Sequence, residues 1–248
     1  MNSINRNGAM RYWEERVWQP PNFKGESEEI QKMAKLILQV VREHAPENLR
    51  ILEVGCGAGN LTVNVLSELN RHKQYDCLDV SQAALDVLER RVSSLFPDLS
   101  AENFRTHCAY FNGSGFFPDR QGQFDVIACA RVLNHIPNIH EFFQGIAKSL
   151  KHKGVFVCDA IPGEERPIQL RQNYGWKASL VQTVYNGARG LSERRILSEL
   201  FSRSGLLRSH FPAIPEIFNS LEKGGLKLGL VSMDYQTHYY RFVAKKVN

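Results

Sequence analysis

The segment Glu53-Val54-Gly55-Cys56-Gly57-Ala58-Gly59 decides the fold of this chain. It follows a short apolar run, Arg50–Val54, and precedes a helical pattern from about Asn60 to Asn70. Glycine allows a tight turn and lets a ligand lie directly against the backbone. Glycines placed between a strand and a helix therefore predict a ligand-binding loop at the carboxyl end of a parallel strand.

The spacing of these glycines limits the kind of ligand. The dinucleotide fingerprint G-x-G-x-x-G needs a glycine where this chain has Asn60, and the spacing here is G-x-G-x-G instead. Because a pyrophosphate needs the N-terminus of the helix left clear, the sequence argues against a nicotinamide-dependent oxidoreductase. That class of enzyme stays an alternative, since it uses a similar sheet.

Strand and helix patterns alternate on both sides of the glycine segment. Helix starts are expected at Ser27, Asn60, Ser81 and Asn138, with Pro46 ending the first helix and a turn at Lys151–Gly154. Strands are expected at Arg50–Val54, Tyr75–Val80, Phe104–Tyr110, Phe124–Ala130 and Val155–Cys158. This order predicts an α/β fold, a doubly wound and mostly parallel sheet with helices on both faces.

Beyond Asp159 the alternation weakens, and we expect an insertion or cap after the fifth strand. The sequence predicts a single domain over 1–248, divided into an N-terminal lid-like segment (1–26), a cofactor-binding half (27–160), the insertion (161–190) and the C-terminal half of the sheet (191–248). In the last part we expect a helix at Ser192–Arg203 and two strands, Leu206–Phe211 and Tyr239–Val247, which would make the sheet seven-stranded.

Composition narrows the class of protein. The chain has 31 basic and 26 acidic residues, a formal net charge of +5, and no run concentrates the basic residues, so nucleic acid is not indicated as a partner. Its 5 cysteines are scattered without a C-x-x-C pair, which predicts reduced thiols in a cytoplasmic protein and no metal site. No apolar stretch is long enough to span a membrane, and the polar Met1–Met10 argues against a secretory signal.

A second candidate site residue is Asp79, which ends the second predicted strand twenty residues after Gly59. A carboxylate in this place can accept hydrogen bonds from both hydroxyls of a nucleoside ribose. Asp76 lies earlier in the same strand, and we expect it to be a surface carboxylate.

With the glycine segment, Leu78–Ser81 and Phe124–Ile127 in place, the chain resembles the class I S-adenosylmethionine-dependent methyltransferases. Val132–Ile136 and Leu150–Val157 fit the later motifs of that family. The resemblance covers residues 30–160 and, more loosely, the last sixty.

The resemblance implies S-adenosylmethionine as the cofactor and methyl transfer as the reaction. The glycine loop would cradle its methionine part and Asp79 would bind its ribose. The loop Tyr110–Gly113 would flank the adenine, with Asn112 near the place of the family's usual acidic residue. The cofactor contacts implied in this way are Glu53, Gly55, Cys56, Gly57, Gly59, Asp79, Val80, Asn112 and Ala130.

Residues that touch the methyl acceptor are harder to assign, because the cofactor brings the reactive group. His135, just after the fourth strand, is a candidate base. Arg131 is a candidate for binding an acidic acceptor, and Tyr12 and Trp13 are candidates for closing over the site. The structural alternatives are capping of the loop for His135, a surface ion pair for Arg131, and packing for Tyr12 and Trp13.

The acceptor itself is predicted to be a small molecule methylated at oxygen or nitrogen. In the family, an Asn-Pro-Pro-Tyr run after the fourth strand marks methylation of adenine or of a glutamine amide, and this chain has Ala130-Arg131-Val132-Leu133 there. An RNA or protein methyltransferase, or a non-catalytic subunit that binds S-adenosylmethionine, stays an alternative, and the oligomeric state stays open.

Overall fold

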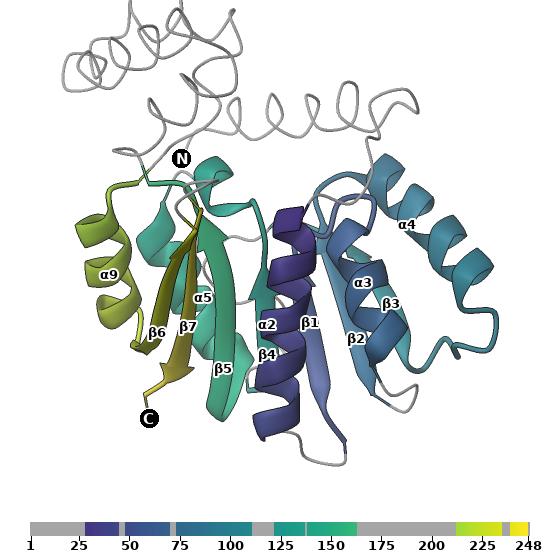
Figure 1. Ribbon diagram of the computed structural model, residues 1–248, viewed down its shortest axis with the longest axis horizontal. Coiled ribbons are helices and arrows are strands. Elements are labelled where there is room, and N and C mark those ends of the chain that lie inside the picture. The colour runs from purple at the N-terminus through teal and green to yellow at the C-terminus, as the bar shows by residue number, and fades with distance from the viewer. Residues whose placement is uncertain are drawn as a thin grey trace, which may run out of the picture.

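The computed structural model describes residues 28–44, 48–69, 73–110, 122–136, 138–162, 212–234 and 239–247. Its strands form one seven-stranded sheet in the order β3-β2-β1-β4-β5-β7-β6 (Figure 1). The parallel strands are β1 (Arg50–Val54), β2 (Gln74–Asp79), β3 (Phe104–Cys108), β4 (Phe124–Cys129) and β5 (Leu150–Ala160). β7 (Tyr239–Lys246) lies between β5 and β6 (Leu226–Asp234) and is antiparallel to both. The predicted doubly wound, mostly parallel sheet is confirmed.

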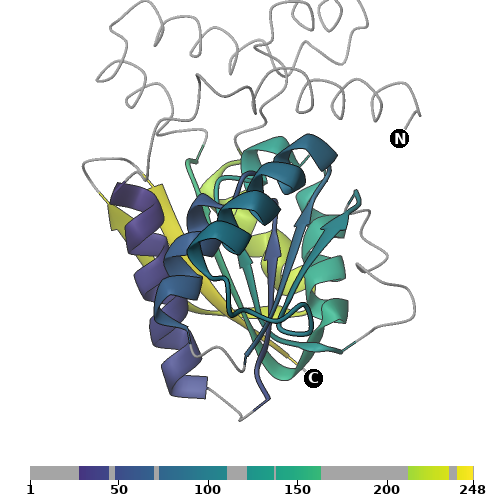
Figure 2. The ribbon, with the colours of Figure 1, turned by 90° about the vertical axis from the view of Figure 1, so that its right-hand side faces the viewer.

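Helices cover both faces of the sheet (Figure 2). α2 (Glu28–His44), α3 (Asn60–Glu68) and α4 (Gln82–Leu95) lie on one face, and α5 (Ile139–Ser149) and α9 (Ile214–Lys223) lie on the other. Two of the predicted helix caps are confirmed. The Ser81 hydroxyl accepts a hydrogen bond from the Ala84 N–H at 3.2 Å, and Asn138 Oδ1 accepts one from the Glu141 N–H at 3.2 Å. Such caps satisfy N–H groups that have no partner within the helix.

The core consists of two apolar layers, one on each face of the sheet. On the α5 side, the ring of Phe156 from β5 packs edge-on against Phe142 and Phe143, with ring centroids 6.3 and 5.9 Å apart. All three side chains are buried, and truncating one such phenylalanine typically costs about 3–5 kcal/mol. The central strands are buried on both faces, and because they run parallel their carboxyl ends meet at one edge of the sheet.

The turn expected at Lys151–Gly154 is wrong, because these residues belong to β5. The strand starts at Leu150, opposite Phe124, and its register shifts before Val126. Lys153 adopts a left-handed conformation, with φ 62°, and takes up this irregularity. A Cβ atom on Gly154 would lie 2.9 Å from the carbonyl oxygen of Lys151, so a glycine is needed there.

The C-terminal part of the sheet differs from the prediction in one strand. Tyr239–Lys246 is a strand, as expected, but its neighbour is Leu226–Asp234, which follows α9, and neither was predicted. β6 is an edge strand with Gly229 at its middle and exposed apolar side chains at Leu230 and Val231, so its pattern differs from that of a buried strand. The predicted helix Ser192–Arg203, the strand Leu206–Phe211 and residues 1–26 lie outside the described residues, as does most of the insertion 161–190.

Within the described ranges, no helix is long and apolar enough to cross a membrane.

Candidate functional site

The glycine loop lies at the carboxyl end of β1 and follows the predicted geometry. Gly55, Gly57 and Gly59 have φ angles of 70°, 54° and 84°, a region that side chains strongly disfavour. The Gly55 N–H donates to the carbonyl oxygen of Leu78 at 2.7 Å, so the loop starts against the end of β2. A Cβ atom on Gly55 would lie 2.2 Å from Cγ2 of Val132, and one on Gly59 would lie 2.2 Å from Cδ1 of Leu88. The loop therefore packs closely against Val132 at Gly55 and against Leu88 at Gly59, and a side chain at either position would force its neighbour to move.

Asp79 ties this loop to the end of β2. Its Oδ2 accepts a hydrogen bond from the Gly57 N–H at 2.8 Å, and its Oδ1 accepts one from the Ser81 N–H at 3.0 Å. Burial raises the pKa of the Asp79 carboxyl, and the backbone hydrogen bonds act in the opposite direction. A carboxylate has about four lone-pair sites, so Asp79 keeps the capacity to accept a hydrogen bond from a ligand.

Glu53 lies beneath the loop and is 2% exposed. Its Oε2 accepts hydrogen bonds from the Thr62 hydroxyl and the Tyr75 hydroxyl, both at 2.8 Å. Burial raises the pKa of Glu53 to about 7, partly opposed by these hydrogen bonds. The contact with Tyr75, on β2, was not predicted, because a tyrosine in an apolar strand gives no sign of its hydroxyl partner.

A second loop, after β4, faces the glycine loop. Arg131 has a φ of 61°, and its backbone N–H donates to Asp159 Oδ1 at 2.6 Å. The 3-10 helix η3 (Leu133–His135) follows, and the His135 N–H donates to the Val132 carbonyl oxygen at 2.8 Å. Among the described side chains, Asn134 has a buried Oδ1 with no hydrogen bond, and a buried acceptor of this kind is costly unless a ligand or water supplies a donor.

The structure places Arg131 and His135 in one loop, but with different environments. Arg131 is exposed, and its guanidinium lies over the ring of Tyr239 at 6.0 Å from the centroid. His135 is half-buried. Ala130 begins the same loop, and Val80 directly follows Asp79; both are half-buried. These positions bring the two predicted acceptor residues to the edge of the sheet where the glycine loop lies.

Cys56 is buried in the glycine loop, and burial raises the pKa of its thiol well above the ordinary value. The thiol therefore stays protonated near neutral pH, which leaves it without the thiolate that a nucleophile needs. The predicted site residues Asn112, Tyr12 and Trp13 lie outside the described residues.

The expectation that Asp76 is a surface carboxylate is wrong, since it is 2% exposed. His107 Nε2 lies 2.7 Å from its Oδ1, and Arg50 Nη2 lies 3.4 Å from its Oδ2. Although burial alone would raise it, these two partners lower the pKa of Asp76. β2 is covered on both sides, so a charged residue within it needs partners on the neighbouring strands β3 and β1.

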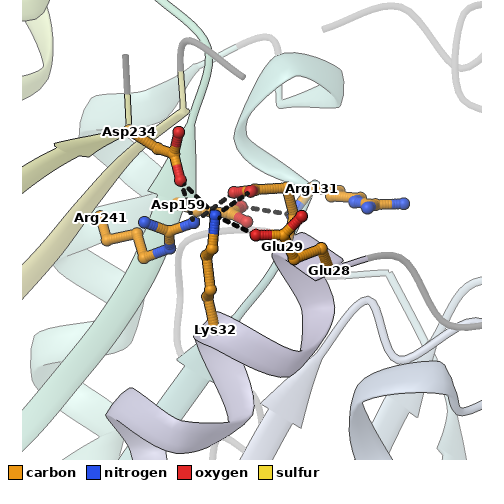
Figure 3. A network of polar contacts seen from close by, with 7 residues as sticks. All are labelled: Glu28, Glu29, Lys32, Arg131, Asp159, Asp234 and Arg241. Carbon is orange, nitrogen blue, oxygen red and sulfur yellow. Dashed lines mark hydrogen bonds and ion pairs between the residues drawn. The ribbon is translucent and has the colours of Figure 1, made fainter. Parts of the chain in front are cut away.

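Sequence reasoning also missed a group of charged residues beside Asp159, at the carboxyl end of β5. Figure 3 shows them together: Glu28, Glu29, Lys32, Arg131, Asp159, Asp234 and Arg241. They come from α2, the loop after β4, and the last three strands. No local pattern indicates such a group, because bonded members such as Glu29 and Arg241 lie 212 residues apart in the chain.

Comparison with known proteins agrees with this geometry. Residues 52–156 match a family model described as a methyltransferase domain. A ubiquinone biosynthesis O-methyltransferase of Rickettsia bellii is 24% identical over 127 residues, which are 50% of this chain and 48% of the relative. An uncharacterised methyltransferase of Schizosaccharomyces pombe is 30% identical over 122 residues, 46% of this chain and 40% of that protein. The chain thus spans about half the length of the curated relatives that it matches.

Solved structures share the fold over more of the chain. A magnesium protoporphyrin IX methyltransferase from Synechocystis, solved with bound S-adenosylmethionine, has a TM-score of 0.63 at 12% identity and covers 99% of this chain and 100% of that one. A geranyl diphosphate C-methyltransferase from Streptomyces coelicolor has a TM-score of 0.60 at 12% identity and covers 99% of both chains. The two kinds of comparison agree: residues 52–156 match a methyltransferase domain in sequence, and the chain has the fold of the solved S-adenosylmethionine-dependent methyltransferases.

Proposed function

We propose that this chain binds S-adenosylmethionine at the glycine loop and transfers its methyl group to an oxygen or nitrogen of a small-molecule acceptor. The observation that carries the proposal is the carboxylate of Asp79, which holds the Gly57 and Ser81 N–H groups and keeps free lone pairs. A carboxylate fixed at the carboxyl end of the second strand suits the two hydroxyls of a ribose.

The residues present fit this cofactor. The left-handed glycines leave bare backbone at the carboxyl end of β1, against which the methionine part would lie. Asp79 would hold the ribose. Glu53 and Cys56 lie beneath and in the glycine loop, Val80 directly follows Asp79, and Ala130 begins the loop after β4. When bound, the cofactor supplies a methyl group on a positively charged sulfur, so it is the electrophile of the reaction.

The chain's own residues then have to bind the acceptor and accept the proton that it loses. The exposed guanidinium of Arg131, over the ring of Tyr239, is suited to a carboxylate or another anionic group of the acceptor. The imidazole of His135, in η3 of the same loop, would take the proton from a hydroxyl or amine near neutral pH. A small-molecule acceptor is supported by the names of the relatives, which include ubiquinone biosynthesis O-methyltransferases.

Calorimetry tests the cofactor directly. S-adenosylmethionine and its demethylated product should bind and raise the melting temperature, because a ligand bound only by the folded state stabilises it. NADH serves as the matched comparison and should do neither. Tighter binding of NADH would contradict the proposal and favour an oxidoreductase.

A screen of methyl acceptors tests the proposed reaction. Methyl-labelled S-adenosylmethionine is incubated with panels of small hydroxy acids, phenols and amines, and with RNA and protein, and products are read by mass spectrometry. Label on a small molecule is the expected result. Label on RNA or protein would change the acceptor class, and binding without any transfer would favour a non-catalytic subunit.

A further inference from the structure

Three members of the charged group at the carboxyl end of β5 are buried. Asp159 is 2% exposed, Glu29 6% and Arg241 8%. Burying a charge costs free energy, and replacing buried ion pairs by apolar residues is often neutral or stabilising. Stability alone is therefore a weak reason for this cluster, and its position beside the loop after β4 points to a role in the site.

Asp159 connects the cluster to that loop through a main-chain contact. Its Oδ1 accepts a hydrogen bond from the Arg131 N–H at 2.6 Å. In Figure 3 the side chain of Arg131 points away from the cluster, so Asp159 holds the backbone and leaves the guanidinium directed elsewhere. Arg131 has a φ of 61°, a conformation that a non-glycine residue adopts only where its surroundings impose it.

The turn at Arg131 determines where the next residue lies. Val132 Cγ2 occupies the space that a Cβ atom on Gly55 would need, at 2.2 Å. Gly55 is the first glycine of the cofactor loop, so Val132 forms one wall of that loop. A hydrogen bond thus joins the Asp159 side chain to the Arg131 backbone. That backbone leads to Val132, which packs against Gly55.

Asp159 is itself held in place from the side of the C-terminal strands. Arg241 lies directly opposite it in the β5–β7 register. Burial raises the pKa of Asp159 to about 6, opposed by the Arg131 N–H and by the positive charges of Arg131 and Arg241. Arg241 in turn donates to Glu29 on α2 and lies 3.8 Å from Asp234. Lys32 joins the same acids, at 2.5 Å from Asp234 and 3.3 Å from Glu29.

We propose that Asp159 is a positioning residue of the methyl-transfer site: its carboxylate holds the left-handed turn at Arg131 and thereby sets the loop after β4 against the glycine loop. Asp159 acts through the Arg131 backbone and through Val132. The effect on ligand binding rests on the proposed function. The hydrogen bond from the Arg131 N–H to Asp159, which we call the clamp, is a property of the fold that can be measured without any ligand.

The test compares Asp159→Leu, which removes the acceptor, with Asp159→Asn, whose Oδ1 can accept the same N–H. Asp125→Leu is the matched control. Asp125 also accepts a backbone N–H from a neighbouring strand, that of Arg50 at 2.8 Å, and pairs with Lys151 at 2.8 Å, but it lies at the opposite edge of the sheet. Asp159→Ser, which ends short of the Arg131 N–H, replaces Asp159→Leu if that variant does not fold.

Two measurements are made on each folded variant: hydrogen exchange at the Arg131 amide, and the affinity for S-adenosylhomocysteine by calorimetry. In Asp159→Leu we expect exchange at least tenfold faster and binding at least tenfold weaker. Asp159→Asn should stay within threefold of the wild type in both, and Asp125→Leu should leave both unchanged.

Unchanged exchange at Arg131 in Asp159→Leu would overturn the clamp. Faster exchange with full affinity would overturn the positioning role, and so would an equal loss of affinity in Asp125→Leu. If the wild-type protein did not bind S-adenosylhomocysteine at all, the proposed function would fail, and the exchange measurement alone would decide the clamp.

Discussion

The carboxylate of Asp79 and the backbone N–H of Gly57 are joined by a hydrogen bond of 2.8 Å, which fixes the glycine loop to the end of β2. The same side chain is proposed to bind the ribose, so one residue both shapes the loop and contacts the ligand. Changes at Asp79 are therefore expected to affect ligand binding in two ways, by loss of the direct contact and through the shape of the loop.

Asp79→Ala should weaken binding of S-adenosylhomocysteine by about 1–3 kcal/mol, the range for lost hydrogen bonds to a charged group. Asp79→Asn should also weaken it, because the amide NH2 would face the N–H of Gly57 or of Ser81. Calorimetry measures both. The control is Asp86→Asn, on the exposed face of α4, and equal affinity in all three variants would remove Asp79 from the ribose site.

Gly55→Ala should lower the free energy of unfolding by about 2–4 kcal/mol, through the left-handed φ and the overlap with Val132. In a Val132→Ala background the same change should cost at least about 1 kcal/mol less, because Cγ2 is gone. Urea denaturation of the four proteins measures this coupling.

The control is Gly122→Ala. Gly122 has a φ of 67°, but among the described residues a Cβ there would meet only the Leu150 carbonyl oxygen, at 3.9 Å. It should show the backbone cost alone, about 1 kcal/mol. A coupling free energy of zero between Gly55→Ala and Val132→Ala would mean that the glycine loop and the loop after β4 are not in close contact at these two residues.

Glu53 should make stability depend on pH. Its pKa is raised from 4.5 to about 7 in the folded protein, so the folded state holds a proton that the unfolded state has lost in this interval. The resulting stabilisation is complete below about pH 4.5 and disappears as pH rises through about 7. At about 1.4 kcal/mol per pKa unit, it amounts to about 3 kcal/mol.

Glu53→Gln keeps an oxygen for Thr62 and Tyr75 but cannot ionise. Relative to the wild type, its free energy of unfolding should therefore rise between pH 5 and pH 8, as measured by urea denaturation at both values. Glu43→Gln, on the exposed end of α2, should run parallel to the wild type. A parallel curve for Glu53→Gln as well would show that Glu53 is ionised throughout.

His135→Ala should lower the turnover number by about a hundredfold once an acceptor is found, with the affinity for S-adenosylhomocysteine retained. His152→Ala, at an exposed position of β5, is the control and should keep full turnover. Steady-state kinetics measure the turnover number of both variants and of the wild type. Full turnover in His135→Ala would mean that the acceptor needs no base from this position.

The parts of the fold that could be predicted are those with a local physical cause. A left-handed conformation costs least at glycine, and Gly55, Gly57 and Gly59 all have positive φ. A helix start needs a side-chain acceptor, and Ser81 and Asn138 supply one. The apolar run at Phe124–Cys129 is buried on both faces of the sheet.

The parts that could not be predicted depend on partners far away in the chain. Glu29 and Arg241 are 212 residues apart, and nothing near either of them indicates the other. Asp159 stood at the end of a predicted strand, but its hydrogen bond to Arg131 depends on the register between β4 and β5. β6 was missed because an edge strand is not required to be apolar on both faces.

The antiparallel position of β7 between β5 and β6 has a consequence during protein synthesis. β5 pairs with β7 from Val155 to Ala160, yet this partner is made later, after α9 and β6. Until Tyr239–Lys246 leaves the ribosome, the apolar part of β5, from Val155 to Cys158, has no partner on one side, and such an edge pairs readily with other chains. Chains that stop before Tyr239 should therefore aggregate during translation instead of completing the sheet.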